Sequence, residues 1–514
     1  MSASKAALHP APIRTAHDEP FWEAAGRGVL LIKACIRCDR THWYPRAHCP
    51  LCGSTDTVWR EASGRGTIYS FSIVPRSKRP TAVCIVELDE GPKVTTIIVD
   101  SDIHAMRLED PVRVRFEPAD DGSSIPVFTT KAAEKARAYA MRTDEASLNV
   151  ADVLGTTPLP IKSAAVIGAG SMGIGITKAL LSGGLPVQLI EPDDAARERA
   201  AADLATYVSR KLEQGSNPFP SIELSGDLDD ASDADVVIEA VWEDFAVKKD
   251  VLVTLDRVLK PSAILATNTS TLDINLLAAS TTNPGRVLGM HFFSPAHVMR
   301  LVEIVRGQAT DSTILASSIA LAQRLGKTPV VVGVCHGFAA NRMMIARNQE
   351  AEQLLLEGST PEQVDRVMRE MGLPMGPFEM LDMAGGIEVN VRRRQASGEP
   401  NWLIDALYKR GRLGQKSGRG FYRYQDDDRI PRPDPEVNSL IEQASEQAGL
   451  VRRRIPDSEV RRRLLDRLAG EGHAIAAEGV VARIGDLDVM WRHGFGWPDW
   501  SGGPMYAAGR AGEM

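Results

Sequence analysis

The chain has 514 residues. This is too long for a single domain built around one hydrophobic core, so three or four domains are expected. Its 43% hydrophobic and 25% charged residues are typical of an ordinary soluble globular protein. The net charge of −7 argues against nucleic acid as the main partner, because a phosphate backbone is bound by clustered basic residues.

The sequence also argues against a membrane partner. No stretch approaches the roughly 18 consecutive apolar residues of a transmembrane helix. The N-terminal segment MSASKAALHPAPIR lacks the apolar core of a signal peptide. We therefore expect a cytoplasmic protein.

Two Cys-x-x-Cys pairs lie near the N-terminus, in CIRCDRTHWYPRAHCPLC (35–52). In a reducing compartment this paired spacing indicates a metal site rather than disulfides. Four thiolates form a closed tetrahedral set, which suits structural Zn²⁺; iron in a rubredoxin-like site and an empty site are the alternatives. The predicted metal ligands are Cys35, Cys38, Cys49 and Cys52.

Short β-rich runs broken by turn residues follow, from GTIYSFSIV (66–74) to IPVFTT (125–130). Enrichment in Val, Ile and Thr, with Gly and Asp at the breaks, predicts a small antiparallel barrel or sandwich over 61–130. Residues 131–160 have the pattern of a short helix followed by a Pro/Gly/Thr linker.

The pattern changes at about residue 161. Continuous apolar runs such as AAVIG (164–168) and ADVVIEAV (234–241) alternate with amphipathic helical segments. Runs without polar alternation indicate strands that are covered on both faces. They predict a mostly parallel, doubly wound, Rossmann-like α/β sheet over 161–336.

Helical patterns dominate after residue 337. They predict a helical domain over 337–425, followed by a linker at 426–436. The sequence EGSTPEQVDRVMREMGLPMGP (357–377) is loosely repeated as EGVVARIGDLDVMWRHGFGWPDWSGGP (478–504). Residues 437–514 are therefore predicted to form a second, truncated copy of the helical domain.

A glycine-rich turn directly after a strand, GAGSMG (168–173), fits the dinucleotide-binding pattern G-x-G-x-x-G. Its glycines permit the turn and the approach of backbone to a pyrophosphate, and the following helix N-terminus favours negative charge. A carboxylate at the end of the next strand, Glu191, can bind the adenosine ribose and would repel a 2′-phosphate, which favours NAD over NADP. A glycine-rich turn without a ligand is the alternative. The predicted residues are Gly168, Gly170, Ser171, Met172, Gly173 and Glu191.

Seven stretches in order along residues 160–514 resemble the 3-hydroxyacyl-CoA dehydrogenase family. They are VIGAGSMGIGI, ADVVIEAVWEDFAVKK, ATNTSTLDI, GMHFFSPAHVMRLVEIVRG, GFAANRMM, MGPFEMLDMAG and GRLGQKSGRGFY. The resemblance implies an NAD-binding Rossmann domain followed by helical domains of the 6-phosphogluconate-dehydrogenase-like type. It also implies NAD-dependent oxidation of an (S)-3-hydroxyacyl-CoA substrate to the 3-oxoacyl-CoA, in fatty-acid or related β-oxidation.

By this resemblance, His291 is the catalytic base and Glu303 its carboxylate partner. An imidazole exchanges protons near neutral pH, and a carboxylate on its second nitrogen fixes the tautomer. A strand–turn–strand return through SPAHVMR (294–300) would bring the two residues together. Ser270 and Asn341 match polar residues around the substrate hydroxyl and thioester carbonyl.

The resemblance implies further NAD contacts and a homo-oligomer. Relatives pair through their helical domains, so a homodimer is expected. The additional NAD-binding positions are Ala240, Val241, Glu243, Lys248, Asn268 and Lys416.

The N-terminal stretches FWEAAGRGVLLIKACIRC, YPRAHCPLCG, SGRGTIYSFSIV and VELDEGPKVTTIIVD resemble a different family. They are similar to the zinc-ribbon plus OB-fold proteins of acyl-CoA metabolism (the DUF35 type), over about 18–130. This implies a zinc ribbon at 18–60 and an OB-fold at 61–130. It also implies a unit that binds acyl-CoA or docks to a thiolase or enoyl-CoA hydratase partner.

Two other functions stay open. The chain could be a scaffold that recruits a thiolase or hydratase and has weak or no dehydrogenase activity, although the intact set of predicted catalytic residues argues against it. It could also be a β-hydroxyacid dehydrogenase acting on a substrate without CoA. The sequence does not indicate the acyl group, because pocket volume depends on three-dimensional packing.

Overall fold

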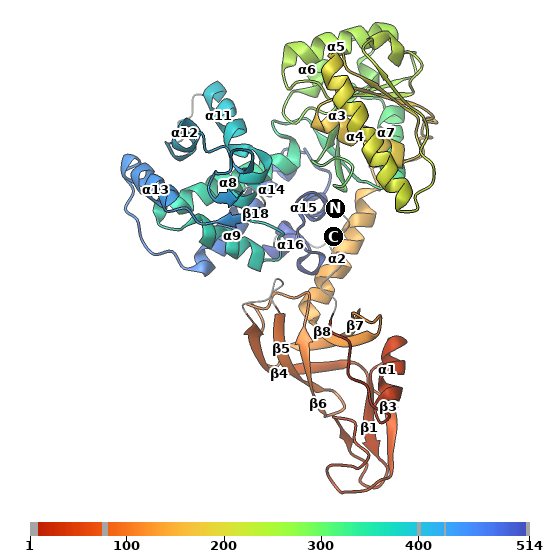
Figure 1. The fold of residues 1–514 in the computed structure, drawn as a ribbon, viewed down its shortest axis with the longest axis vertical. Helices are drawn as coiled ribbons and strands as arrows, with labels where there is room; N and C mark the ends of the chain where they lie inside the picture. Colours follow the sequence, from red (N-terminus) through yellow and green to blue (C-terminus); the bar gives the residue numbers. More distant parts are fainter. Residues whose placement is uncertain (1–8, 75–80, 398–401, 426–427, 510–514) are drawn as a thin grey trace. The chain divides into compact units, whose positions relative to one another are not determined.

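The computed structural model describes residues 9–74, 81–397, 402–425 and 428–509. The chain divides into two compact units, residues 1–139 with 499–502 and residues 140–498 with 503–514. The boundary between them falls inside helix α2 (Lys131–Ser147) (Figure 1). This helix takes up the first half of the segment 131–160, for which a short helix and a linker were predicted. Residues 398–401 and 510–514 of the predicted helical domains, and 426–427 of the second predicted linker, lie outside the described residues.

The first unit begins with a small antiparallel sheet in the order β2-β1-β3, preceded by helix α1. The cysteine pairs lie in the turns beside this sheet, and Cys35 is the last residue of β1. The elements are α1 (Glu19–Gly26), β1 (Leu31–Cys35), β2 (Thr41–His42) and β3 (Thr57–Glu61).

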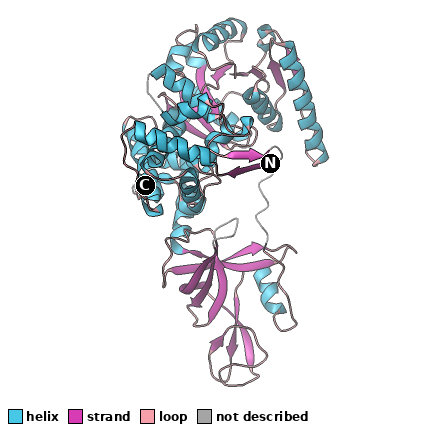
Figure 2. Cartoon of the chain, turned by 60° about the vertical axis from the view of Figure 1, so that its left-hand side comes forward, coloured by secondary structure: helices cyan, strands magenta, loops and turns pink. Residues whose placement is uncertain are grey.

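The strands that follow curl into a barrel (Figure 2). Their order around the barrel is β4-β5-β6-β8-β7, which is the arrangement of an OB-fold. β6 and β8 pair in parallel and the other pairs are antiparallel. Ile68, Val86, Ile98 and Phe128 are fully buried in its interior, which confirms the predicted barrel over the sandwich. The strands are β4 (Arg65–Val74), β5 (Thr81–Leu88), β6 (Lys93–Ile98), β7 (Pro111–Pro118) and β8 (Ser124–Thr130).

The second unit contains a sheet in the order β11-β10-β9-β12-β13-β14-β15-β16. The strands are β9 (Ala164–Ile167), β10 (Val187–Ile190), β11 (Ile222–Ser225), β12 (Val236–Glu239), β13 (Ile264–Thr267), β14 (Val287–Phe292), β15 (Leu301–Arg306) and β16 (Thr328–Gly333). The order from β11 to β14 is that of a Rossmann fold, and only the β14–β15 pair among the described strands of this sheet is antiparallel. The predicted Rossmann-like sheet is confirmed.

Helices cover both faces of this sheet, which explains its uninterrupted apolar strands. α3, α4 and α7 share one hydrophobic cluster with the sheet, and α5 and α6 share the other. These helices are α3 (Ser171–Ser182), α4 (Asp194–Glu213), α5 (Phe245–Val258), α6 (Ile274–Ala278) and α7 (Ser312–Arg324).

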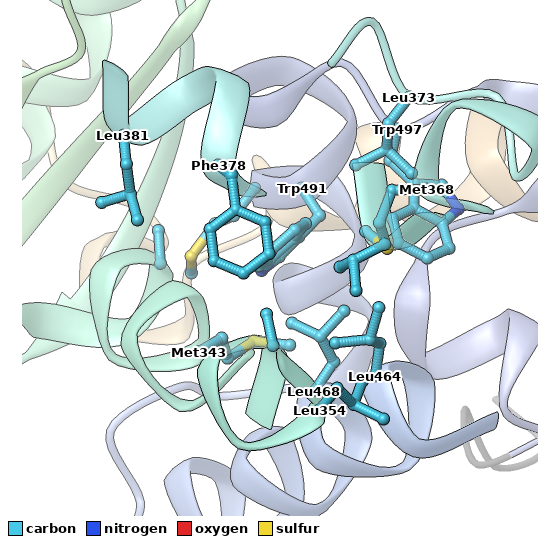
Figure 3. Packing of buried hydrophobic residues seen from close by; sticks show 14 of the residues in the cluster. Met343, Leu354, Met368, Leu373, Phe378, Leu381, Leu464, Leu468, Trp491 and Trp497 are labelled. Carbon is cyan, nitrogen blue, oxygen red and sulfur yellow. The ribbon is translucent and has the colours of Figure 1, made fainter. Parts of the chain in front are cut away.

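The rest of the second unit is mainly helical, as predicted, and packs around one core. In Figure 3, Met343 and Leu354 of α8 lie close to Leu464 and Leu468 of α14 and to Trp491 of α15. The helices are α8 (Phe338–Glu357), α9 (Pro361–Glu370), α10 (Pro377–Ala384), α11 (Gly386–Ser397), α12 (Trp402–Lys409), α13 (Pro435–Gln447), α14 (Asp457–Ala477), α15 (Ile484–Phe495) and α16 (Pro504–Ala507).

One local prediction was wrong. The segment 426–436 was expected to be a linker, but its described part contains β18 (Asp428–Arg432), which pairs antiparallel with β17 (Arg423–Gln425). None of the hairpin residues is fully buried, and an Arg432–Asp428 ion pair lies within β18. Tyr424 packs against the helical core, but so little apolar surface is covered that the sequence carries no sustained alternating hydrophobic signal.

The two repeated segments share a buried carboxylate that caps a Gly-Pro helix start. Asp365 accepts from the amides of Phe378 and Glu379 at the start of α10, both at 3.0 Å. Asp488 accepts from the amides of Met505 and Tyr506 at the start of α16, at 2.7 and 3.2 Å. This common cap supports the repeat, and the truncated second copy stays a prediction.

Among the described helices, none combines the length and the hydropathy needed to cross a bilayer. The predicted cytoplasmic localisation stays a prediction.

Candidate active site

The antiparallel turn between β14 and β15 places His291 directly opposite Glu303. Their side chains lie on the same face of the sheet, and His291 Nδ1 is 2.8 Å from Glu303 Oε2. Both side chains are buried. The predicted strand–turn–strand return therefore brings this pair together.

Glu303 is held at both carboxylate oxygens. Its Oε1 accepts a hydrogen bond from the backbone N–H of Ala340, in the first turn of α8, at 2.9 Å. An ionised carboxylate only accepts hydrogen bonds, so Nδ1 of His291 carries the proton in the bond to Oε2. The other ring nitrogen, Nε2, is then the proton acceptor of the imidazole.

Aromatic rings flank His291. The ring centroid of His291 is 4.6 Å from that of Phe293 and 5.6 Å from that of Phe338. Phe338 starts α8 in the left-handed region, at φ 50°, directly after Gly337 at φ 75°. This tight start aims the first turn of α8, which carries Ala340 and Asn341, at the end of the sheet.

The loop after β13 is tied to the strand that carries His291. Asn268 Oδ1 accepts from the backbone N–H of Phe292 at 2.9 Å. Two residues further on, the Ser270 hydroxyl donates to Glu243 Oε1 at 3.2 Å. The structure thus joins Asn268, Ser270 and Glu243 at the carboxyl end of the sheet, and Asn341 lies next to Ala340.

Glu243 is the acceptor for this loop. Its Oε1 also takes hydrogen bonds from the Thr269 hydroxyl at 2.6 Å and the Ser270 amide at 2.8 Å. Burial alone would raise the pKa of Glu243, but the Thr269 hydrogen bond and the Lys248 ammonium outweigh it and hold the pKa below its usual range. Glu243 is therefore an ionised anchor for the Ser270 loop.

Lys248 is buried beneath this loop in an ion pair with Glu239. Its ammonium lies 2.9 and 3.1 Å from the two carboxylate oxygens of Glu239, 3.1 Å from the carbonyl of Val241 and 3.4 Å from Glu243. Burial raises the pKa of Glu239, and the Lys248 charge opposes this shift. Lys248 therefore acts through Glu243 instead of presenting a free ammonium.

Glu239 was not among the residues predicted from the sequence. It ends β12, an otherwise apolar strand, and is fully buried. Burying a charged residue in such a strand is costly unless the charge is paired. The position of Glu239 in the sequence therefore could have indicated a buried ion pair.

The glycine-rich turn lies where the strand order of the sheet reverses, between β9 and β12. Gly168 has φ 98°, and a Cβ there would lie 2.9 Å from the carbonyl oxygen of Ala240, which brings Ala240 and Val241 next to the turn. A Cβ on Gly173 would lie 1.8 Å from the carbonyl oxygen of Gly168, so only glycine fits.

The surroundings of this turn fit a dinucleotide. A Cβ on Gly170 would meet no atom within 4 Å, and helix α3, which begins with Ser171 and Met172, has no side-chain cap. Its first backbone N–H groups are therefore available to a pyrophosphate. Glu191 Oε2 accepts from the amide of Ala169 at 2.8 Å, which orients the carboxylate at the edge of the turn.

The predicted NAD contact Lys416 is placed elsewhere. It lies in the 3-10 turn η4 (Gln415–Ser417), in the helical part of the unit. The contact that the structure gives its ammonium is an ion pair with Glu388 of α11.

The four predicted metal ligands come together in the first unit. Their sulfur atoms all lie within 4.8 Å of one another, with Cys35–Cys52 at 3.6 Å and Cys38–Cys49 at 3.8 Å. A tetrahedral Zn²⁺ with Zn–S bonds of about 2.3 Å separates its sulfurs by about 3.8 Å. The thiolate set therefore fits a closed, structural zinc site.

We predict that the purified protein holds about one zinc ion per chain. Cys38→Ser should lose the metal and lower the melting temperature of the first unit, because structural zinc binding contributes folding free energy. Cys84→Ser, which changes a buried cysteine of the barrel, is the matched control and should keep the zinc. Elemental analysis measures the zinc content, and thermal unfolding measures the melting temperature. Full zinc content in Cys38→Ser, or an iron–thiolate absorption band in the wild type, would contradict the assignment.

We also predict that Lys248→Met destabilises the second unit by about 3–5 kcal/mol, because it leaves Glu239 buried without its partner. The double variant Glu239→Gln/Lys248→Met should recover most of this loss, and the exposed neighbour Lys249→Met should lose little. Denaturant unfolding measures the change. A double variant no more stable than Lys248→Met would show that the pair is not coupled.

Family models match most of the chain. Residues 163–335 match the 3-hydroxyacyl-CoA dehydrogenase, NAD binding domain, and residues 337–424 match the C-terminal domain of the same family. Residues 22–58 match the ChsH2 rubredoxin-like zinc ribbon domain, and residues 59–117 match the ChsH2 C-terminal OB-fold domain.

Curated relatives match the dehydrogenase part. The chain is 38% identical over 376 residues to the peroxisomal bifunctional enzyme of Danio rerio and 36% identical over 377 residues to that of Homo sapiens. Each alignment covers 69% of this chain and 52% of the relative, so the chain spans about half the length of these relatives.

Solved structures agree with this assignment. The 3-hydroxybutyryl-CoA dehydrogenase of Escherichia coli K12 is 26% identical, with a TM-score of 0.58 over 69% of this chain and 92% of that one. The dehydrogenase part of multifunctional enzyme 1 from C. elegans is 28% identical, with a TM-score of 0.53 over 71% of this chain and 87% of that one.

The matched NAD-binding domain and zinc ribbon agree with the two predicted cofactors, NAD and structural Zn²⁺. The roles of the individual site residues stay predictions. The chain belongs to the 3-hydroxyacyl-CoA dehydrogenase family and carries a zinc ribbon and an OB-fold of the ChsH2 type in its N-terminal part.

Proposed function

We propose that the protein oxidises the C3 hydroxyl of (S)-3-hydroxyacyl-CoA thioesters to the 3-oxo group with NAD, in fatty-acid or related β-oxidation. The observation that carries this proposal is the buried hydrogen bond between His291 Nδ1 and Glu303 Oε2. Bound NAD supplies the acceptor for the hydride that leaves C3. The residues of the chain accept the proton and orient the substrate.

His291 accepts the hydroxyl proton on Nε2. Glu303 stabilises the imidazolium that forms, and the Ala340 amide keeps the carboxylate directed at Nδ1. The flanking rings of Phe293 and Phe338 limit the access of water to the imidazole.

Ser270 and Asn341 orient the substrate. The single proton of the C3 hydroxyl goes to His291, so Ser270 donates to the C3 oxygen. In the free protein the Ser270 hydroxyl donates to Glu243 at 3.2 Å. When substrate binds it turns toward the C3 oxygen, and Glu243 keeps its hydrogen bonds from the Thr269 hydroxyl and the Ser270 amide. The Asn341 amide group donates to the thioester carbonyl. Holding the substrate in a reactive orientation can lower the activation free energy by several kcal/mol. The upper limit for such positioning is about 7–11 kcal/mol.

The glycine-rich turn holds the pyrophosphate of NAD. Gly168, Gly170 and Gly173 leave room for it, and the N-terminus of α3 faces its charge. Glu191 binds the adenosine ribose and repels the 2′-phosphate of NADP. Ala240, Val241 and Asn268 line the nicotinamide side, and contact of Lys416 with NAD stays a prediction.

We propose that residues 22–117 dock a thiolase or enoyl-CoA hydratase partner, or bind acyl-CoA themselves. The match to the ChsH2 domains supports this role, as do two exposed apolar residues, Ile36 and Leu51, between the paired cysteines of the ribbon. The expected homodimer stays a prediction.

The test is NADH formation from 3-hydroxyacyl-CoAs of increasing bulk. The wild type should reduce NAD with at least one of them, and free CoA should inhibit it. His291→Gln should lower kcat about 10²–10⁴-fold, because the proton acceptor is lost, and leave the Kd for NAD nearly unchanged. Absorbance of NADH measures turnover, and fluorescence titration measures binding.

His297→Gln is the matched control, because this histidine packs against Tyr207 away from the Glu303 pair and should keep its activity. Turnover that survives in His291→Gln would place the base elsewhere. A wild type that forms no NADH and co-purifies with a thiolase would favour the scaffold function, and activity that free CoA does not inhibit would favour a substrate without CoA.

A further inference from the structure

Residues 437–498 of the second unit lie beyond the segment 337–424 that matches the C-terminal dehydrogenase domain. They nevertheless contact the elements that carry the predicted catalytic groups. We propose that Phe495, in α15, is a positioning residue that holds Phe293 against the ring of His291. This inference rests on the proposed function, in which His291 accepts a proton.

A series of ring contacts connects the helical core to His291. The centroids of Phe293 and Phe495 are 5.8 Å apart with an edge-to-face angle of 76°, and Phe293 lies 4.6 Å from His291. On its other side Phe495 stacks on Trp491, at 4.4 Å and 26°. Trp491 is fully buried and lies among the core residues of α8 and α10 in Figure 3, so the series has a rigid end.

The backbone around Phe495 lies directly on the strands of the site. A Cβ on Gly494 would approach Leu301 Cδ2 to 2.6 Å, so α15 packs closely on the first residue of β15, the strand of Glu303. At the end of β16, the amide of Gly333 donates to the carbonyl of Val480 at 2.7 Å, and Val332 pairs with Val481. The segment that leads into α15 is therefore fixed to the sheet.

A second contact fixes the same segment to α8. Arg342 directs its two terminal nitrogens to the carboxylate of Glu478, at 2.5 and 2.7 Å, and its Nε to Glu471 at 2.6 Å. Arg342 follows Asn341 in the chain. The bidentate pair thus holds the end of α14 next to the turn that carries Asn341 and Ala340.

These contacts restrict the orientation of the His291 imidazole, which its hydrogen bond to Glu303 alone does not fix. The covalent bond to Cβ and the hydrogen bond at Nδ1 hold the imidazole at two points, and the ring can still tilt about the line that joins them. Contact of the ring with Phe293 and Phe338 removes this freedom and keeps Nε2 aimed in one direction. Phe293 holds its place only if its outer edge is also packed, and Phe495 provides that packing.

The test is Phe495→Ala compared with the ring-retaining Phe495→Tyr. We expect Phe495→Ala to lower kcat about 10- to 100-fold, because a displacement of about 1 Å in a reacting group costs about 10²-fold. The KM for the acyl-CoA and the Kd for NAD should change less than about twofold. Phe495→Tyr should restore most of kcat.

Phe378→Ala is the matched control. Phe378 is a buried ring of the same helical core and pairs with Phe421 at 4.6 Å, away from His291. It should lower the melting temperature at least as much as Phe495→Ala and keep kcat within about twofold at a temperature where both variants are folded. Unchanged kcat in Phe495→Ala, or an equal loss of kcat in Phe378→Ala, would overturn the proposal. Should Phe495→Ala not fold, Phe495→Leu takes its place in every comparison.

A second readout does not depend on turnover. In proteins with ¹³C-labelled histidine, the Cε1–H signal of His291 should shift in Phe495→Ala, because the ring of Phe293 moves, and stay in place in Phe378→Ala. An unmoved signal would overturn the proposal even if the wild type is active. A wild type without dehydrogenase activity would defeat the proposed function alone, and the shift would still decide whether Phe495 positions His291.

Discussion

The hydrogen bond between His291 and Glu303 depends on the register of the antiparallel pair β14–β15. The two residues are direct cross-strand neighbours, so a slip of one residue would turn one side chain to the opposite face of the sheet. The neighbours of both residues are apolar and buried on both faces of the sheet, so apolar burial alone does not select this register. A slip would instead leave the buried imidazole and carboxylate without their partners, and the cost of such unpaired polar groups favours the register that joins them.

Two buried carboxylates, Glu303 and Glu239, lie at the carboxyl end of the sheet. The cost of burying each one is offset by different partners. Glu303 is satisfied by an imidazole and a backbone amide, so it responds when the imidazole gains a proton. Glu239 is paired with the buried ammonium of Lys248, which also lies 3.4 Å from Glu243 and, through it, holds the Ser270 loop. In the proposed function the first pair takes part in proton transfer, and the second fixes the position of the groups around it.

Much of this fold could be predicted from the sequence because its signals are local. Continuous apolar strands, the glycine-rich turn and the cysteine spacing each reflect burial or geometry within a few residues, and the family resemblance supplied the His291–Glu303 pair. The β17–β18 hairpin gave no clear signal because its strands are short and none of their residues is fully buried. The buried partner of Lys248 and the contact of Phe495 with Phe293 depend on distant parts of the chain meeting. Likewise, pairing of Lys416 with Glu388 is a property of the folded helices.

The tautomer of His291 can be measured directly by ¹⁵N NMR of histidine-labelled protein, with the signals assigned by their loss in His291→Gln. In the neutral ring, a proton on Nδ1 and a bare Nε2 are expected, because Glu303 accepts only from Nδ1. A neutral ring that carries its proton on Nε2 would contradict the role of His291 as the proton acceptor.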